Sequence, residues 1–367
     1  MSDFSTSGGF NPVLNGVFNP SPTDALMAPP PPPPGVYVLE LAGERDDDAF
    51  ARREATAAAT GVEPLAAGLA LVDSVAPDRL RGLAFTHRAS ELLGRTDADP
   101  AAARALVEAA PIDRSGTVAV RARDVRSTTG VSTADVERSL GDVLVDRGFA
   151  VDLDDPDHEL RALFAGGEGD ATTTDGVCAV GWLTAEADRA FGERAPTDRP
   201  FFQPGSMDPI LARAVCNLAG VAPGTRLLDP FCGTGGILLE GALLGADVVG
   251  VDAQSKMVRG TARNLADAGI DGGAVCRGDA TRLPLSDGAV DAVAFDAPYG
   301  RQSKIAGADL GNLVADALAE ARRVGERCVL VADRDYTAAA ETAGWTALDR
   351  FERRVHRSLV RHVHVLE

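Results

Sequence analysis

Short apolar runs alternate with longer amphipathic segments through the second half of the chain. The runs cover residues 225–229, 247–251, 273–276 and 290–295, with one more near Ala332. Segments of helical length lie between them, including 237–244 and 309–323. Strands alternating with helices predict an α/β fold with a doubly wound, mostly parallel sheet. Apolar and polar residues alternate over 350–366, which predicts an antiparallel pair that closes the sheet.

The first half mixes strands and helices in an α+β order. Strand patterns occur at 36–41 and 118–123, and Gly181 to Leu183 predicts a last strand. Ser132 opens a helix whose apolar face is formed by Val136, Leu140, Val143 and Leu144. We expect a disordered proline-rich tail over 1–35, an α+β module over 36–165, a linker over 166–195 and the α/β domain over 196–367.

Acidic residues follow four of the predicted parallel strands. They are Asp229, Asp252, Asp279 and Asp296. Each alone is more often a surface or capping residue, but parallel strands bring their carboxyl ends to one edge of a sheet. A glycine-rich turn over 230–236 joins the first strand to its helix and lacks both Gly-x-Gly-x-x-Gly and a Walker lysine. This pattern favours an adenosine ligand without a pyrophosphate.

The stretch Asp296-Ala297-Pro298-Tyr299 carries the candidate chemistry. The carboxylate can accept hydrogen bonds from an exocyclic amino group, and the proline stiffens the turn. The tyrosine ring can stack on a base, a contact worth about 1–3 kcal/mol. Alone, this stretch is also a common turn. With the upstream acids and glycines, it indicates an enzyme that acts on the amino group of a nucleobase.

The order of these motifs resembles the class I S-adenosylmethionine-dependent methyltransferases, and Asp-Ala-Pro-Tyr their amino-methylating branch. Residues 199–207, with 211–214 and 217–219, resemble the archaeal THUMP-domain tRNA guanosine N2-methyltransferases, which modify guanosine 10. The first half resembles a THUMP domain by pattern rather than by signature residues. Two positions depart from the family: Ala297 replaces a proline, which loosens the turn, and Gln203 stands where we expect a histidine.

The resemblance implies S-adenosylmethionine as the cofactor, tRNA as the partner, no metal, and a cytoplasmic monomer. It implies three groups of site residues. The catalytic group is Asp296, Pro298 and Tyr299. The cofactor-binding group is Asp229, Phe231, Gly233, Gly235, Asp252 and Asp279. From the placement of basic residues, we expect RNA contact at Arg121, Arg123, Arg301 and Arg357, the last within a basic stretch over 350–364.

The charge balance at first argues against an RNA partner, because the net charge is −18. Only two lysines occur, Lys256 and Lys304, within a total of 36 basic residues. An acidic, lysine-poor composition resembles halophilic proteins, and in molar salt the Debye length is only about 3 Å. Net charge then says little about partners.

The five cysteines form no Cys-x-x-Cys pair, which argues against a zinc site and for a reducing compartment. The sequence has no apolar run near the roughly 18 residues of a membrane span. Two alternatives to tRNA methylation stay open. One is a DNA or rRNA amino-methyltransferase, and the other is a non-catalytic RNA-binding protein with a degenerate methyltransferase fold.

Overall fold

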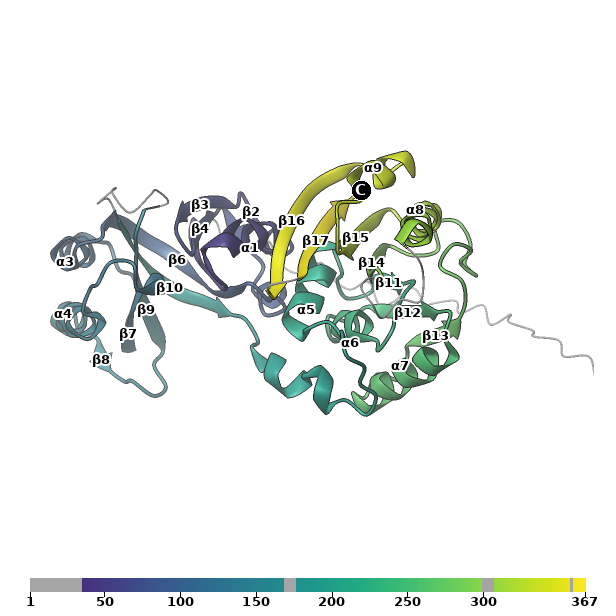
Figure 1. The fold of residues 1–367 in the computed structure, drawn as a ribbon. Helices are drawn as coiled ribbons and strands as arrows, with labels where there is room; N and C mark the ends of the chain where they lie inside the picture. The colour runs from purple at the N-terminus through teal and green to yellow at the C-terminus, as the bar shows by residue number, and fades with distance from the viewer. Residues whose placement is uncertain (1–34, 168–175, 299–306, 357–358) are drawn as a thin grey trace, which may run out of the picture. The chain divides into compact units, whose positions relative to one another are not determined.

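The computed structural model describes residues 35–167, 176–298, 307–356 and 359–367 (Figure 1). Apart from Gly35, the predicted proline-rich tail lies outside these residues. No helix in the described ranges combines the length and the apolar character needed to cross a membrane.

The N-terminal half is built around one large sheet. Among the described residues, its strand order is β3-β4-β1-β6-β10-β9-β7-β8, and β2 pairs with β5 separately. The strands are β1 (Tyr37–Leu41), β2 (Ala59–Thr60), β3 (Glu63–Ala66), β4 (Leu69–Val72), β5 (Ser74–Val75), β6 (Thr86–Asp97), β7 (Thr117–Asp124), β8 (Ala150–Val151), β9 (His158–Ala165) and β10 (Val177–Glu186). The helices are α1 (Asp48–Ala55), α2 (Pro77–Leu80), α3 (Pro100–Ala109) and α4 (Thr133–Asp146), with 3-10 turns at Arg45–Asp47 and Val125–Ser127.

Helix α4 buries the face that the sequence predicts. All four of its predicted apolar residues are buried against the sheet, together with residues of α3, β7 and β9. Helices α3 and α4 lie side by side (Figure 1). Ser132 is the N-cap residue, as expected, but its side chain does not cap the helix. Its hydroxyl instead lowers the pKa of the Asp135 carboxylate through a hydrogen bond, with Arg138 as a second donor.

The C-terminal half forms the predicted doubly wound sheet, in the order β13-β12-β11-β14-β15-β17-β16. Strands β11 to β15 run parallel to one another, and β17 is antiparallel to both β15 and β16, so the expected antiparallel closure is confirmed. The strands are β11 (Arg226–Asp229), β12 (Asp247–Asp252), β13 (Ala274–Arg277), β14 (Ala292–Asp296), β15 (Arg327–Ala332), β16 (Ala347–His356) and β17 (Leu359–Leu366). The helices are α5 (Pro209–Leu218), α6 (Gly236–Leu243), α7 (Ser255–Asp267), α8 (Gly307–Val324) and α9 (Thr337–Thr342).

Both faces of this sheet are covered because successive residues of a strand point to opposite sides. In β14, Ala292 and Ala294 pack with residues of α5, α6 and α7. Val293 and Phe295 of the same strand pack with residues of α8 and α9. A strand buried on both faces reads as a continuous apolar run, which explains the pattern in the sequence.

The segment expected as a linker, residues 166–195, contains a central strand. Strand β10 covers the predicted strand at Gly181 to Leu183 and pairs with both β6 and β9. The connection to the second half therefore begins after Glu186, and it contains two 3-10 turns, Ala190–Arg194 and Pro196–Asp198. The apolar pattern of 177–183 resembles that of any short strand, so only its partners identify it as part of the sheet.

A buried carboxylate joins α1 of the first half to α5 of the second. Glu54 is fully buried and accepts hydrogen bonds from the backbone N–H groups of Ala84 (2.7 Å) and Phe85 (2.6 Å). The side-chain amide of Asn217, on α5, donates a third bond of 2.6 Å. Burial raises the pKa of Glu54, and these three donors oppose that rise. The two halves share one apolar core around this contact.

We predict that Glu54→Gln destabilises the protein. A glutamine amide would turn its own N–H₂ toward one of the three donors, and each buried donor left unpaired costs about 1–3 kcal/mol. Denaturant unfolding followed by circular dichroism measures the change, with Glu63→Gln, at an exposed position, as the matched control. Equal unfolding midpoints for the two variants would contradict this role of Glu54.

Candidate active site

The four predicted acids come together at one edge of the C-terminal sheet. Asp229, Asp252 and Asp296 are the last residues of β11, β12 and β14. Asp279 follows the end of β13 by two residues. These strands are successive neighbours in the sheet, and their carboxyl ends face the same edge. The sequence prediction of a shared edge is therefore matched by the structure.

Hydrogen bonds tie the glycine-rich turn to two of the acids. The Asp229 Oδ1 accepts from the Phe231 N–H at 3.0 Å, and the Asp252 Oδ2 accepts from the Gly233 N–H at 3.1 Å. Gly233 and Gly235 both have positive φ, +53° and +81°. A Cβ at Gly235 would lie 2.6 Å from the side chain of Thr261, on α7. Gly235 therefore lets the turn pack closely against α7.

The space at Gly233 is different. A Cβ there would meet only the Phe231 carbonyl oxygen, at 3.7 Å. The backbone at Gly233 is thus open on the side where a side chain would stand, while its N–H is held by Asp252. The turn presents bare backbone at the sheet edge, as a ligand that lies against main chain requires.

Burial perturbs two carboxylates at this edge, and like charge adds to its effect at Asp229. Burial raises the pKa of Asp229 well above its usual value, and the nearby charges of Asp252 and Asp296 raise it further. Burial also raises the pKa of Asp252. Among the described residues, no three acidic, histidine or cysteine side chains are arranged to hold a metal ion. A positively charged organic ligand would relieve the repulsion between these carboxylates.

Asp296 has a cationic partner from the last strand. The Nη2 of Arg361, on β17, donates to the Asp296 Oδ2 at 3.3 Å. The Arg361 side chain is only 7% exposed, and that of Asp296 is 21% exposed. The sequence placed Arg361 in a basic stretch with a possible RNA-binding role, and the strand pattern alone cannot show that it points inward to an acid.

The turn after Asp296 is held by its backbone. The Ala297 N–H donates to the Val331 carbonyl of β15 at 2.8 Å, and Ala297 is buried. A proline at this position would have no N–H for this bond. The substitution that we expected to loosen the turn therefore supplies a bond that the proline cannot make. Pro298 is partly exposed and is the last described residue before the gap.

The segment over 199–207 crosses the glycine-rich turn and is locked to α7. Asn264, on α7, exchanges two bonds of 2.8 Å with the backbone of Phe201 and donates to the Thr234 carbonyl at 2.9 Å. The Ser206 and Thr234 hydroxyls lie 2.9 Å apart. A Cβ at Gly260 would stand 2.0 Å from the Phe201 ring, so only glycine fits beneath it. Sequence reasoning missed Asn264 because its partners are distant in the chain.

Two other predicted cofactor residues have local contacts. The Asp279 carboxylate is exposed and accepts from the N–H and the hydroxyl of Thr281. The Phe231 ring packs against Phe295 with centroids 5.5 Å apart. Both residues lie at the predicted edge, and their contact with a cofactor stays a prediction.

The arginines predicted to bind RNA divide into two groups. In the first half, Arg123 pairs with Glu40 at 3.3 Å, and Arg121 donates to the Leu153 carbonyl at 2.6 Å. Both retain partly exposed side chains, and their contact with RNA stays a prediction. The remaining predicted residues, Tyr299, Arg301 and Arg357, lie outside the described residues.

The basic stretch over 350–364 is partly occupied by internal contacts. Arg353 pairs with Asp47 at 2.7 Å and lies over the rings of Phe50 and Phe85, at 4.7 and 4.5 Å from their centroids. Arg361 pairs with Asp296, as described above. These two arginines hold the fold together, so the basic stretch is less available to RNA than its sequence suggests.

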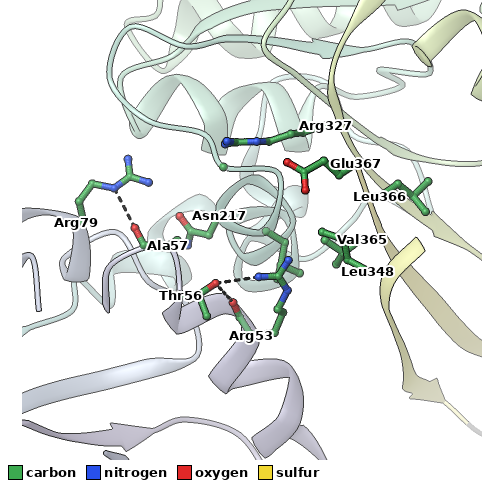
Figure 2. A pocket seen from close by; sticks show the side chains of 12 residues that line it. Arg53, Thr56, Ala57, Arg79, Asn217, Arg327, Leu348, Val365, Leu366 and Glu367 are labelled. Carbon is green, nitrogen blue, oxygen red and sulfur yellow. Dashed lines mark hydrogen bonds between the residues drawn. The ribbon is translucent and has the colours of Figure 1, made fainter. Parts of the chain in front are cut away.

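Two cavities lie away from the acids. One, of about 360 Å³, lies near the start of β15 and the end of β17, the opposite edge of the sheet, and its basic lining residues are Arg53, Arg79 and Arg327 (Figure 2). The other, of about 640 Å³, lies on the N-terminal sheet beside Trp182. Neither is lined by a predicted site residue. We therefore place the site by the convergence of the strand ends.

Comparison with known proteins agrees with this assignment. Residues 196–362 match the family of RMKL-like methyltransferase domains, and residues 100–164 match the THUMP domain family. The tRNA (guanine(10)-N2)-dimethyltransferase of Methanothermobacter thermautotrophicus is 37% identical over 78% of this chain and 83% of the relative. The enzyme of the same name from Pyrococcus abyssi is 32% identical over 69% and 74%.

A third relative of that name, from Methanocaldococcus jannaschii, is 30% identical over 69% of this chain and 71% of its own length. The resemblance that the motifs indicated is confirmed, and so are the THUMP and class I methyltransferase folds. With its THUMP domain, its RMKL-like methyltransferase domain and these relatives along most of its length, the chain belongs to the archaeal family of tRNA guanine-N2 methyltransferases.

Proposed function

We propose that this protein transfers a methyl group from S-adenosylmethionine to the exocyclic N2 amine of guanosine in tRNA, at position 10. The observation that carries the proposal is the position of Asp296 at the end of β14, beside Asp229 and Asp252 and paired with Arg361. The names of the relatives support the substrate and the position.

The residues at the sheet edge fit S-adenosylmethionine. Asp229 and Asp252 offer negative charge to a ligand with a sulfonium and an ammonium group, and Asp252 is also placed for ribose hydroxyls, as in dinucleotide folds. Gly233 provides open backbone beside them. When bound, this cofactor supplies an activated methyl group.

The chain's own contribution is to orient the guanine amine. The lone pair of this amine is delocalised into the ring, so the amine is a poor nucleophile. Asp296 accepts a hydrogen bond from one N–H and favours a pyramidal nitrogen whose lone pair points at the methyl group. Positioning of this kind lowers the barrier without a general base, because the proton leaves after attack. Stacking of the base on Tyr299 belongs to the same proposal.

We further infer that the enzyme adds two methyl groups, in agreement with the names of the relatives. After the first transfer the N2 nitrogen of guanine keeps one N–H group, and this group can still donate a hydrogen bond to Asp296. The second transfer therefore needs no additional catalytic residue. Mass spectrometry of nucleosides from reacted tRNA distinguishes one added methyl group from two.

We also propose a reducing, salt-rich cytoplasm as the place of action and a monomer as the active form. The described cysteines are free thiols, four of them buried, which suits a reducing compartment. The net charge of −18 with two lysines suits a salt-loaded interior.

Asp296→Asn tests the proposed chemistry. The amide keeps the shape of the side chain but weakens the acceptor, and we expect methyl transfer to tRNA to fall on the order of 100-fold, as when a positioned polar group is removed from an active site. Radiolabelled methyl transfer to tRNA, rRNA and duplex DNA gives the rate and the substrate class, while calorimetry checks that cofactor affinity is kept.

The control is Asp271→Asn, an exposed aspartate elsewhere in the domain. Turnover of Asp296→Asn within a few-fold of the unsubstituted protein would exclude this role of Asp296. Methylation of rRNA or DNA in preference to tRNA would reject the proposed substrate.

Arg361 is proposed as a positioning residue for Asp296. A hydrogen bond between charged groups contributes about 1.5–3 kcal/mol, which corresponds to a factor of roughly 10–100 in rate. We expect Arg361→Gln to lower kcat by up to this factor, with little change in KM for tRNA. Arg361→Lys should recover part of the lost kcat. Equal kcat for Arg361→Gln and the unsubstituted protein, or a change in KM alone, would contradict this role.

Cofactor affinity is predicted to depend on pH through Asp252. Because its pKa is raised in the folded protein, Asp252 becomes protonated at a higher pH than an ordinary aspartate as the solution is acidified. Affinity for S-adenosylmethionine should therefore fall as pH decreases from neutrality through this raised pKa. Calorimetric titration at successive pH values measures the fall, and Asp252→Asn should show weaker binding with a flatter pH dependence. An unchanged pH dependence in Asp252→Asn would assign the effect to another group.

A further inference from the structure

Helix α7 presents a row of basic side chains to solvent. Lys256, Arg259 and Arg263 are spaced by three and four residues, so they lie on one side of the helix, and all three are exposed. The opposite side is buried against the sheet and the glycine-rich turn through Thr261, Asn264 and Leu265. The helix contains one acid, Asp267, in its last turn.

The two arginines of this face have no partner among the described residues. Neither Arg259 nor Arg263 forms a hydrogen bond or an ion pair there, even with Asp267 one turn from Arg263. Some exposed arginines elsewhere lie beside acids, at pairs such as Arg138–Asp135 (3.0 Å) and Arg323–Asp287 (2.8 Å), and others, such as Arg81 and Arg95, stand alone without an acidic partner among the described residues. Helix α7 differs from these single positions because it gathers two such arginines and a lysine on one face. In a chain with a net charge of −18, unpaired positive charge on one helix face needs an explanation.

Helix stability does not explain Lys256. The first turn of α7 contains no acid, whereas the helix dipole favours negative charge there by typically 0.3–1 kcal/mol. One of the two lysines of the chain occupies this turn instead. Its ammonium lies 5.6 Å from the centroid of the Phe201 ring and donates to the Gln203 Oε1 at 3.2 Å. Lys256 is thus held in place at a position that costs helix stability.

The face begins at the proposed active site. Helix α7 follows Asp252 within three residues, so its first turn lies at the edge where the acids converge. The neighbouring segment exposes Phe202, whose surface is 40% accessible. From Lys256 to Arg263 the face extends about 10 Å along the helix axis, at 1.5 Å per residue. In Figure 1 the helix lies on the outside of the sheet, beside α6 and β13.

We propose that Lys256, Arg259 and Arg263 bind the phosphate backbone of the RNA next to the nucleotide that is methylated, with Phe202 as a stacking surface at the catalytic end. This inference rests on the proposed function. A polyanion is the partner that fits a row of three cations that have no acidic partner among the described residues, and stacking on an exposed aromatic ring contributes about 1–3 kcal/mol per base.

The test is the salt dependence of tRNA binding. Each phosphate contact contributes about 0.7 to 0.9 to the slope of log K against log salt concentration. We expect Arg259→Gln/Arg263→Gln to reduce that slope by about 1.4–1.8 for a tRNA transcript with guanosine at position 10. The KM for tRNA should rise, while kcat and affinity for S-adenosylmethionine should be kept. Arg259→Lys/Arg263→Lys should keep most of the slope.

The matched control removes two charges from the other edge of the same sheet. Arg226 and Arg327 are exposed at the first positions of β11 and β15, and Arg226→Gln/Arg327→Gln should leave the slope unchanged. An unchanged slope and an unchanged affinity for tRNA in Arg259→Gln/Arg263→Gln would overturn the proposal. The basic face of α7 would then fit an acidic protein partner instead of RNA. Loss of S-adenosylmethionine affinity in that variant would also overturn it, by assigning the arginines to folding. Failure of the unsubstituted protein to methylate tRNA would instead reject the proposed function.

Discussion

Repulsion between carboxylates governs the architecture of the candidate active site. The strand order places Asp229, Asp252 and Asp296 at neighbouring strand ends. Burial raises the pKa of Asp229 and of Asp252, and the nearby carboxylates raise the pKa of Asp229 further. The fold offsets this cost with backbone N–H groups of the glycine-rich turn and with the guanidinium of Arg361. The negative charge that these contacts leave uncompensated favours a cationic ligand. The grouping of buried carboxylates, which destabilises the folded protein, therefore also favours a cationic cofactor.

This arrangement depends on contacts between segments that are distant in the sequence. Arg361 reaches Asp296 because β17 inserts between β15 and β16, and β16 also carries Arg353 to the first half of the chain. Glu54 and Asn217 fasten the first half to α5, which packs on α6 behind the glycine-rich turn. The half that contains the THUMP domain and the methyltransferase sheet thus share one core.

Local patterns were sufficient to predict the C-terminal sheet and the acids at its edge. A strand buried on both faces is a continuous apolar run, and the first acidic residue after the run marks the end of the strand. The same patterns did not reveal Arg361 or Arg353. An alternation of arginine and valine is compatible with a solvated face, and only the position of β17 and β16 in the sheet turns these arginines toward Asp296 and Asp47. Strand β10 was placed in a linker for a related reason, since its role depends on pairing with β6 and β9. Asn264 had no signal, because its partners Phe201 and Thr234 lie 63 and 30 residues away in the chain.

Ala297 illustrates two physical solutions to one constraint. A proline restrains the turn after Asp296 by limiting the conformations of the unfolded chain, whereas the alanine restrains it through an interstrand hydrogen bond to Val331. One solution is entropic and the other depends on an intact neighbouring strand. A family member that lacks the proline therefore need not have a flexible turn at this position. A sequence search that demands the proline would reject such members, although their turn is held by a hydrogen bond. The informative question at this position is whether the backbone amide has an acceptor.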